Sequence, residues 1–225
     1  MKLTPNTIKI LKNFSDINNT IYIRSNSSLI TVDAAKRIVA DVTPEQTFPE
    51  SFAIYNLNEF LSVNSAQDDA ELNFESDKIV FVGNGGKGRL EYFYSDPSTV
   101  QDPMLTRKKI PTVFYEDSVV LKFTLSDETL KCLRQNASLL SLTNISFVGE
   151  NGTVKIVVQD ISKKSSQNKF TLDVDGTAKV SDTYNMLFEN LKILSDSYDV
   201  EVSPTVAHFV GKTTGVQYWI VMEAK

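Results

Sequence analysis

Few side chains of this 225-residue sequence could take part in covalent or proton-transfer chemistry. It contains a single histidine, His208, and a single cysteine, Cys132. Nucleophilic triads and histidine-based metal sites need several suitable groups close together. His208 lies in an alternating run that is typical of a strand, and Cys132 lies among the leucines of a predicted helix, where it is expected to pack as a small apolar residue. The single histidine and the single cysteine therefore give no indication of a catalytic site.

The carboxylates occur as sequence neighbours and not as spaced pairs. Asp68–Asp69, Glu116–Asp117 and Asp127–Glu128 each lie at a predicted turn or helix start. Adjacent residues of a strand point to opposite faces, and acids at a helix start are favoured by the helix dipole. None of these pairs forms an obvious acid–base couple. We therefore predict that the chain is not an enzyme and that it uses neither a cofactor nor a metal.

Two glycine-containing segments resemble phosphate-binding loops but lack the required context. Residues 83–88, Gly-Asn-Gly-Gly-Lys-Gly, match a dinucleotide fingerprint, yet a predicted strand and not a helix follows them. Residues 211–213, Gly-Lys-Thr, resemble the end of a P-loop, but Val206 stands where its first glycine is expected. Both segments are therefore predicted to be hairpin turns.

The composition indicates a folded, strand-rich protein. It is 41% hydrophobic, 23% charged and 10% aromatic. No apolar run approaches the roughly 20 residues that span a bilayer, and Lys9 and Lys12 interrupt the apolar residues near the N-terminus. We expect no membrane segment, no signal peptide and a location inside a cell. The formal net charge of −5 by itself argues against a nucleic-acid partner.

Capping and periodicity predict the elements that must position any functional side chain. Helices are expected to begin after Thr4, at Asn56 and after Ser126, and a fourth is expected at residues 184–194. Alternating runs predict strands at residues 20–24, 28–32, 36–42, 70–74, 78–82, 89–94, 119–125, 145–148, 153–159, 169–174, 198–202, 207–210 and 216–222.

Prolines and a basic run near residue 100 predict a domain boundary. The expected organisation is a first domain at residues 1–107, a connector at 108–118 and a second domain at 119–225. A helix–strands–helix–strands order recurs at a step of roughly 120 to 130 residues, which favours two copies of one domain. The alternative is a mixed fold in which the pattern repeats without common structure.

Basic side chains occupy corresponding helix faces in both halves. Lys9 and Lys12 share one face of the first helix, and Lys131 and Arg134 share one face of the third. Lys192 lies on the exposed side of the fourth predicted helix. A solvated helix face would explain each pair alone, whereas their recurrence favours a shared basic surface.

Several segments together resemble the sliding clamps of T-even-type bacteriophages. The resemblance spans essentially the whole chain and is sharpest in the first half. It implies an α+β DNA-clamp fold with two similar domains per chain, each with antiparallel sheets and two helices, and three chains in a pseudo-six-fold ring. The segments that carry it are residues 1–3, 11–14, 16–18, 53–61 (Ala-Ile-Tyr-Asn-Leu-Asn-Glu-Phe-Leu), 68–71 and 96–100 (Asp-Pro-Ser-Thr-Val).

The resemblance also implies a function. Such clamps form homotrimers that encircle duplex DNA without reading its sequence, and an ATP-driven clamp loader places them there. They tether the replicative DNA polymerase through its C-terminal peptide and support phage late transcription with factors of the RNA polymerase. The implied location is the cytoplasm of the infected bacterial host, with no membrane partner. The alternative is a β-rich phage structural protein of the tail or baseplate with no DNA role.

Three sets of site residues follow from the resemblance. Lysine, a flexible and strongly hydrated charge, suits a ring that holds DNA without base contacts, and the DNA-facing set is Lys9, Lys12, Lys131, Arg134 and Lys192. The subunit-interface set lies on two predicted edge strands, where Tyr92 and Phe170 are equally well explained by burial in their own domain: Leu90, Tyr92, Tyr94, Phe170, Leu172 and Val174. The partner-peptide set lies at the connector and the last strand, where core packing is the alternative: Ile110, Pro111, Val113, Phe114, Tyr218 and Trp219.

A ring changes the meaning of the net charge. The charge of −5 sums over an inside and an outside surface. An acidic exterior would discourage DNA from binding outside the ring and leave a basic lumen as the favourable place for it.

Overall fold

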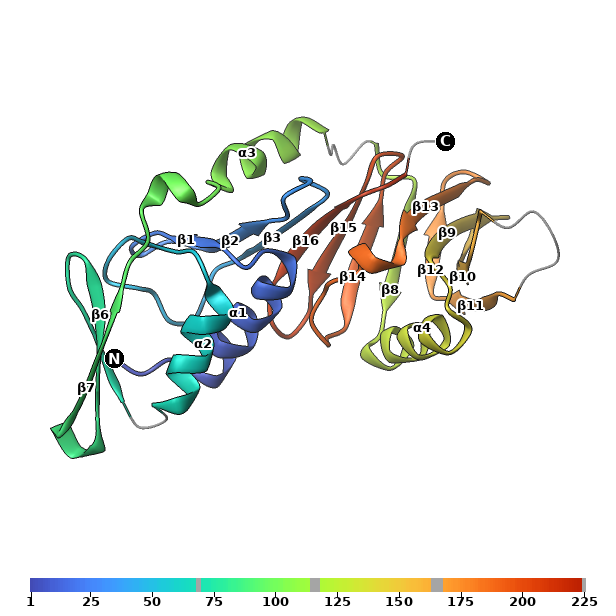
Figure 1. The fold of residues 1–225 in the computed structure, drawn as a ribbon. Helices are drawn as coiled ribbons and strands as arrows, with labels where there is room; N and C mark the ends of the chain where they lie inside the picture. The colour runs from blue at the N-terminus through green and yellow to red at the C-terminus, as the bar shows by residue number, and fades with distance from the viewer. Residues whose placement is uncertain (68–69, 114–117, 163–167, 224–225) are drawn as a thin grey trace. The chain divides into compact units, whose positions relative to one another are not determined.

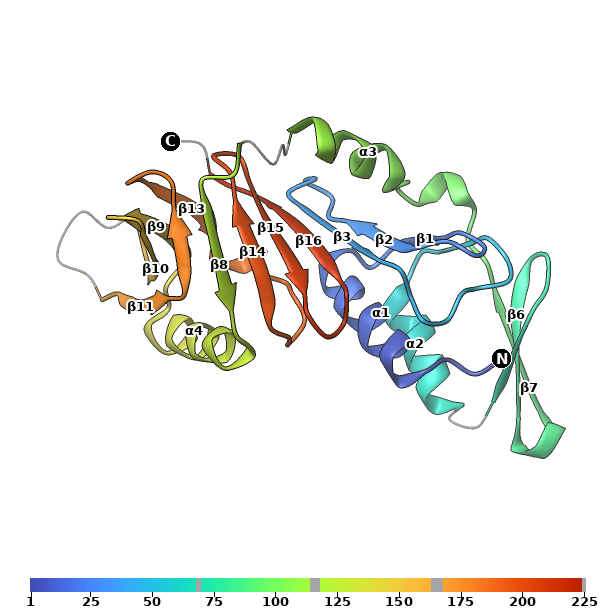
Figure 2. The same ribbon diagram turned by 180° about the vertical axis from the view of Figure 1, so that it is seen from behind.

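The structure is a computed structural model that describes residues 1–67, 70–113, 118–162 and 168–223. The chain divides into two compact units, Met1–Thr106 and Arg107–Lys225, which are drawn from two sides in Figures 1 and 2. The helix α3 (Met104–Val113) contains the boundary between the units. Sequence reasoning placed the start of the connector here and predicted no helix. At the start of this helix, the carboxylate of Asp102 accepts a hydrogen bond from the Met104 N–H at 2.9 Å.

The first unit combines two helices with short antiparallel strands. Its helices are α1 (Pro5–Ile17) and α2 (Leu57–Ala66), which lie side by side (Figures 1 and 2). Strand β1 pairs with β4, β2 pairs with β3, and β5, β6 and β7 form a sheet in that order. The strands are β1 (Ile21–Ile23), β2 (Leu29–Val32), β3 (Ile38–Val42), β4 (Phe52–Ile54), β5 (Glu71–Phe74), β6 (Lys78–Gly83) and β7 (Gly88–Phe93).

Local sequence explains both helices of the first unit. Thr4 caps α1 by accepting a hydrogen bond from the Thr7 N–H at 3.1 Å, and Pro5 occupies the first helical position. In the same way, the Asn56 side chain caps α2 by accepting from the Glu59 N–H at 3.1 Å. Helical spacing buries one face of each helix against the strands, and the buried apolar residues are Ile10, Leu11, Phe14, Ile17, Leu57, Phe60 and Leu61.

The second unit contains α4 (Asp127–Leu140) and two antiparallel sheets. One sheet has the order β11-β10-β9-β13, and the other contains the run β12-β8-β14-β15-β16. Helix α4 contacts β10 and β11 of the first of these sheets. The strands are β8 (Leu121–Leu125), β9 (Asn144–Glu150), β10 (Thr153–Gln159), β11 (Phe170–Val174), β12 (Gly176–Ala178), β13 (Thr183–Leu187), β14 (Tyr198–Val202), β15 (Val206–Gly211) and β16 (Gln217–Val221).

The fourth helix predicted at residues 184–194 is wrong. Its first part is strand β13, and its centre is a single 3-10 turn, η4 (Phe188–Asn190), without a capping side chain. Asn185 lies near the start of the predicted helix. Its side-chain oxygen accepts a hydrogen bond from the Ser146 hydroxyl at 2.7 Å, across the pairing of β13 with β9. The segment is therefore held as a strand by partners on β9, about forty positions earlier in the sequence.

The two glycine-rich segments are hairpin turns, as predicted. Residues 84–86 connect β6 to β7, with Gly85 and Gly86 at φ +64° and +87°. Gly215, at φ +66°, lies in the turn between β15 and β16. A side chain at these positions would strain the backbone, which explains the glycines without a bound phosphate. Over the described parts of the chain, no helix is long and apolar enough to span a membrane.

Candidate functional site

The five basic side chains predicted to face DNA divide into an exposed group and one half-buried residue. Lys9 and Lys12 are exposed on α1, and Lys131 is exposed on α4. Lys192 is exposed in the segment that follows η4. Arg134 is half-buried on α4. Four of the five side chains are therefore accessible to a charged ligand.

Beside Lys12, the groove between α1 and α2 is lined by polar groups that sequence reasoning missed. Helix α1 contributes Lys12 and Asp16, and α2 contributes Asn58, Ser62 and Ser65. Small hydroxyl and amide side chains are common donors to phosphate oxygens. Their spacing of four and three residues along α2 is the sequence signal for this face, because such residues lie on the same side of a helix.

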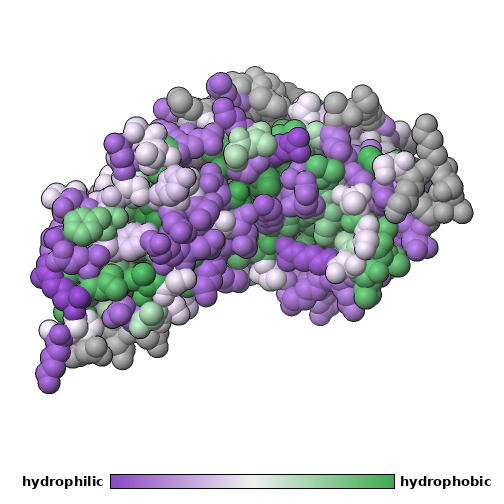
Figure 3. Space-filling view, viewed as in Figure 1, coloured by the Kyte–Doolittle hydropathy of each residue, from purple (hydrophilic) through white to green (hydrophobic). Residues whose placement is uncertain are grey.

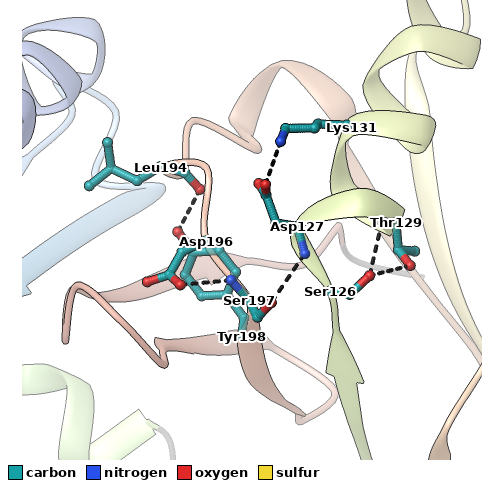
Figure 4. A network of polar contacts seen from close by, with 8 residues as sticks. All are labelled: Ser126, Asp127, Thr129, Lys131, Leu194, Asp196, Ser197 and Tyr198. Atoms are coloured by element: carbon teal, nitrogen blue, oxygen red, sulfur yellow. Dashed lines mark hydrogen bonds and ion pairs between the residues drawn. The ribbon is translucent and has the colours of Figure 1, made fainter.

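Lys131 belongs to a polar network at the start of α4 (Figure 4). Its ammonium lies 2.5 Å from the Asp127 carboxylate, four residues earlier. The Asp127 N–H donates to the Ser197 hydroxyl at 3.2 Å, and this bond ties the helix start to the segment before β14. The Lys131 side chain is 64% exposed, and such an exposed pair contributes about 0.3–0.5 kcal/mol. Lys131 can therefore exchange this partner for a phosphate at small cost.

Arg134 binds backbone carbonyls of its own unit. Its guanidinium donates to the Ile193 carbonyl at 2.6 Å and to the Leu191 carbonyl at 3.3 Å. Burial lowers the pKa of Arg134 from its ordinary value, although an arginine stays charged in either case. The side chain thus holds the segment that takes the place of the predicted fourth helix. This contact cannot be read from the sequence, because the partners lie 57 and 59 residues away.

Replacing Arg134 with methionine should destabilise the second unit. Methionine keeps an unbranched stem but leaves the carbonyls of Leu191 and Ile193 without their donor. Hydrogen bonds to a charged group contribute about 1.5–3 kcal/mol, so we expect a loss of this order in the free energy of unfolding, measured in urea. The matched control is Gln135→Met at the neighbouring exposed position. Equal stability of the two variants would show that the carbonyl contacts contribute nothing.

Strands β7 and β11 are edge strands in the described structure. Strand β7 pairs with β6 on one side, and β11 pairs with β10 on one side. The other side of each strand presents backbone N–H and C=O groups that another chain can pair with. These strands carry five of the six residues predicted for the subunit interface, and Tyr94 directly follows β7.

The aromatic side chains of the predicted interface in the first unit face their own domain. The Tyr92 ring lies 5.5 Å from that of Phe60, and burial and the nearby Glu59 raise the pKa of Tyr92 to about 12. The Tyr94 ring stacks on Phe52 at 4.9 Å. Both tyrosines are therefore explained by packing within the unit, which was the alternative for Tyr92.

The opposite face of β7 carries an aromatic residue that sequence reasoning missed. Phe93 is 59% exposed, and the Lys78 ammonium lies 5.3 Å from its ring centroid. Strand alternation is the signal, because Phe93 must point away from Tyr92 and Tyr94.

Exposed apolar side chains also gather at the end of α4 in the second unit. Leu139 and Leu140 are 72% and 38% exposed, and Figure 3 shows hydrophobic surface in the region of this helix. In β11, Phe170, Leu172 and Val174 are each partly buried and alternate with exposed Thr and Asp residues. Helix α4 contacts β11. An edge strand and exposed leucines therefore occur on adjoining elements.

The six residues predicted for a partner-peptide pocket lie in two places along the chain, at α3 and on β16. Ile110, Pro111 and Val113 lie on α3 with side chains outside the described part, and Phe114 lies outside the described residues. Two further members are on β16. Tyr218 is fully buried, and its hydroxyl accepts a hydrogen bond from the Leu194 N–H at 3.2 Å, so it packs in the core. Trp219 is 6% exposed on the same strand.

No group of histidine, cysteine, aspartate and glutamate side chains in the described parts of the chain is arranged to hold a metal ion. His208 pairs with Gln217, and Cys132 accepts a weak contact from Asn136 on α4.

Comparison with known proteins shows to which family this chain belongs. The sequence is 32% identical over 228 residues to the sliding clamp of Vibrio phage KVP40, and the match covers 100% of both chains. The chain belongs to the sliding-clamp family. Sliding clamps of Escherichia phage RB69 and Enterobacteria phage T4 are 29% and 28% identical, with 100% and 88% of this chain and 97% and 85% of those proteins covered. Comparison with protein-family profiles gives no match.

Solved structures of PCNA, the proliferating cellular nuclear antigen, have the same fold as this clamp. A PCNA2–PCNA3 complex from Sulfolobus tokodaii matches with a TM-score of 0.67 at 12% identity, covering 98% of this chain and 96% of that one. A. fulgidus PCNA bound to the C-terminal region of FEN-1 matches with a TM-score of 0.66 at 13% identity, covering 97% and 95%. The predicted DNA-clamp fold is thereby confirmed.

Family membership gives the clamp its general function. Sliding clamps are processivity factors of DNA replication and are not enzymes, which agrees with the sequence prediction. Whole-length identity to a sliding clamp favours this function over the tail or baseplate alternative.

Proposed function

We propose that three copies of this chain form a ring that encircles duplex DNA and tethers the replicative DNA polymerase. The observation that carries this proposal is the 32% identity to a sliding clamp over the full length of both chains. The two units of each chain would give six units in the ring. The clamp would act in the cytoplasm of the infected bacterial host, loaded by an ATP-driven clamp loader.

The exposed lysines support the encirclement of DNA. Lys9, Lys12 and Lys131 lie on the outer faces of α1 and α4, and Lys192 is also exposed. An ammonium on a flexible stem attracts phosphates without fixed geometry, so DNA can slide past it. The Debye length is about 8 Å at physiological salt, so acids elsewhere on the protein are largely screened from DNA near these lysines.

The edge strands support the ring. We propose that β7 of one copy pairs with β11 of the next, so that the sheets continue between subunits. The exposed Phe93 on β7 and the exposed Leu139 on α4 supply apolar surface near each edge. Such a head-to-tail contact closes into a ring of three copies when three equal rotations complete a full turn, and otherwise it builds an open filament.

Two partner roles complete the proposal. The C-terminal peptide of the polymerase would bind beside α3 and β16, where Trp219 and the α3 residues lie. Late-transcription factors of the RNA polymerase would use the same clamp on DNA. Neither role requires a reactive side chain, in agreement with a chain that has one histidine and one cysteine.

Primer extension on primed circular DNA tests the proposal. The reaction contains the cognate polymerase, the clamp loader and ATP, with and without this protein. We expect long products only when clamp, loader and ATP are all present, and shorter products when the template is linear, because a ring slides off free ends. Product lengths that do not change on addition of the protein would contradict the proposed function.

Reversing the charge of two DNA-facing lysines should impair the clamp without dissociating it. In the Lys9→Glu, Lys131→Glu variant, attraction to phosphates becomes repulsion at six places in a trimer. We expect processive product to fall about threefold to tenfold at physiological salt, because sequence-independent binding to DNA is mainly electrostatic.

The control for this variant carries the same change in net charge elsewhere. Lys87→Glu with Lys179→Glu alters two exposed lysines outside the helices. Equal activity of the two double variants would remove Lys9 and Lys131 from the DNA-facing set. Sedimentation velocity of both variants should give the same mass as the parent protein.

A further inference from the structure

A row of side chains crosses one face of the second sheet of unit two. In the antiparallel register, Lys122 of β8 is opposite Glu201 of β14, Glu201 is opposite His208 of β15, and His208 is opposite Trp219 of β16. Directly opposed residues share a face of a sheet and contact one another. The Lys122 ammonium lies 2.6 Å from the Glu201 carboxylate. The row therefore runs from an ion pair to an aromatic stack.

The stack at the end of the row is well defined. The His208 and Trp219 rings are nearly parallel, at 7°, with centroids 4.6 Å apart. The guanidinium of Arg107, on α3, lies over the Trp219 ring with its central carbon 4.3 Å from the centroid. The Nε2 atom of His208 lies 3.0 Å from the side-chain oxygen of Gln217. With these neighbours, the indole is only 6% exposed.

Arg107 connects this stack to the connector helix. Lys108 and Lys109, the next residues of α3, are exposed, whereas Arg107 is half-buried against the indole. A cation over a desolvated tryptophan is among the stronger contacts of its kind. Arg107 is the first residue of α3 that belongs to the second unit. Its contact with the indole ties α3 to the strand that carries Trp219.

We propose that Arg107 positions α3 through the Trp219 indole, and that this contact holds only while the stacked imidazole of His208 is neutral. An imidazolium would bring a second positive charge to the indole that already binds the guanidinium. The two cations would repel each other, and the contact between α3 and the indole would weaken. This inference rests on the proposed function, in which the polymerase peptide binds beside α3, and it adds a pH-dependent control of that site.

The groups around His208 set the pH at which the contact weakens. Burial lowers the pKa of His208 from its ordinary value, and the positive charge of Arg107 lowers it further. The hydrogen bond with Gln217 and the charge of Glu201 act in the opposite direction, but Glu201 is already paired with Lys122. Because the folded-state pKa lies below the ordinary value near 6.5, the neutral form is retained at pH 7. The contact between Arg107 and the indole is therefore present at pH values above the folded-state pKa of His208. It is lost as the pH falls through that pKa.

The fluorescence of Trp219 tests the inference directly, because it is the single tryptophan of the chain. A cationic imidazole quenches an adjacent indole, so the full-length protein should show a quenching transition with a midpoint below about pH 6.5. His208→Gln should abolish the transition. Arg107→Gln should raise its midpoint by about half a pH unit or more, since a neighbouring positive charge is removed. Arg107→Lys, which keeps the charge, should stay close to the parent.

Two results would overturn the inference. One is a transition that persists in His208→Gln, and the other is a midpoint that is unchanged or lower in Arg107→Gln. The Arg107 variants change a half-buried surface side chain and are expected to fold, so they decide the question even if His208→Gln is unstable.

Peptide binding separates the inference from the proposed function. The probe is a labelled synthetic peptide of the C-terminal segment of the cognate polymerase, and its affinity is measured between about pH 7.5 and 5.5, where histidine titrates. We expect at least a threefold loss of affinity at the lower pH in the parent and little loss in His208→Gln. Tight binding that does not depend on pH would overturn the control by His208. Absence of binding at any pH would overturn the proposed peptide site, while the fluorescence still decides the role of the stack.

Discussion

Replacing Phe93 with glutamate should convert the proposed trimer into monomers at micromolar concentration. Phe93 is 59% exposed at the end of the edge strand β7. Burying a phenylalanine contributes about 1.5–3 kcal/mol, and a glutamate in the same contact would also have to be desolvated. We expect the dissociation constant of each subunit contact to rise roughly a hundredfold or more.

Sedimentation velocity and light scattering measure the mass of this variant, and primer extension measures its activity. The monomer should stay folded, because the Lys78 ammonium that lies over the Phe93 ring can pair with the new carboxylate. The control is Val180→Glu, which changes a 41% exposed apolar residue that is in neither edge strand. A Phe93→Glu protein that remains a trimer and extends primers normally would contradict the proposed use of β7.

Asp196→Ala should destabilise the second unit more than Arg134→Met does. The buried Asp196 carboxylate accepts hydrogen bonds from the Thr214 N–H at 2.8 Å, the Thr213 N–H at 3.1 Å and the Ser197 N–H at 2.7 Å. It thereby joins the segment before β14 to the turn between β15 and β16 (Figure 4 shows Asp196 and Ser197). Alanine removes the acceptor that these three N–H groups share. Hydrogen bonds to a charged group contribute about 1.5–3 kcal/mol each, so we expect a loss of about 3–5 kcal/mol in the free energy of unfolding.

Acid should remove the contribution of Asp196 in the parent protein. Burial acts to raise the pKa of Asp196, but the hydrogen bonds from Thr214, Thr213 and Ser197 outweigh burial and lower it overall. A depressed folded-state pKa stabilises the protein above the unfolded value of about 3.9, and this stabilisation is lost as the pH falls through the folded-state pKa.

Urea unfolding at several pH values checks both expectations. Asp196→Asn is the matched control, because it keeps one acceptor oxygen and removes the charge. It should lose less stability than Asp196→Ala at pH 7, and its difference from the parent should shrink below about pH 4. An alanine variant as stable as the parent would show that the turn does not depend on this carboxylate.

Local signals were sufficient for much of the fold. Thr4, Asn56 and Ser126 each accept a hydrogen bond from the backbone N–H three residues later, as their capping positions predicted. The apolar stripe of α4, with Leu130 and Leu133, is buried as its spacing predicted. These features depend on contacts within one turn of the chain, so the sequence contains all the necessary partners.

Local signals were misleading where a distant partner competes. The segment around Asn185 was predicted to be helical, but it pairs with β9 as strand β13, and Asn185 accepts a hydrogen bond from Ser146. Strands β4 and β12 were missed because each has three residues and is defined by its neighbour in the sheet. The carbonyls of Leu191 and Ile193 that Arg134 binds were not predicted, because they lie 57 and 59 residues away.

By itself, the sequence determined the family, the absence of a catalytic constellation, the starts of α1, α2 and α4, and the basic faces of α1 and α4. Only the tertiary structure showed which face of β7 is exposed to solvent and which carbonyls Arg134 binds. It also showed that Arg107, Trp219 and His208 form one stack. The physical reason is the range of the interactions. Caps and helix faces are set by residues a few positions apart, whereas a stack such as that of Arg107 on Trp219 joins residues more than one hundred positions apart, which only the folded sheet brings together.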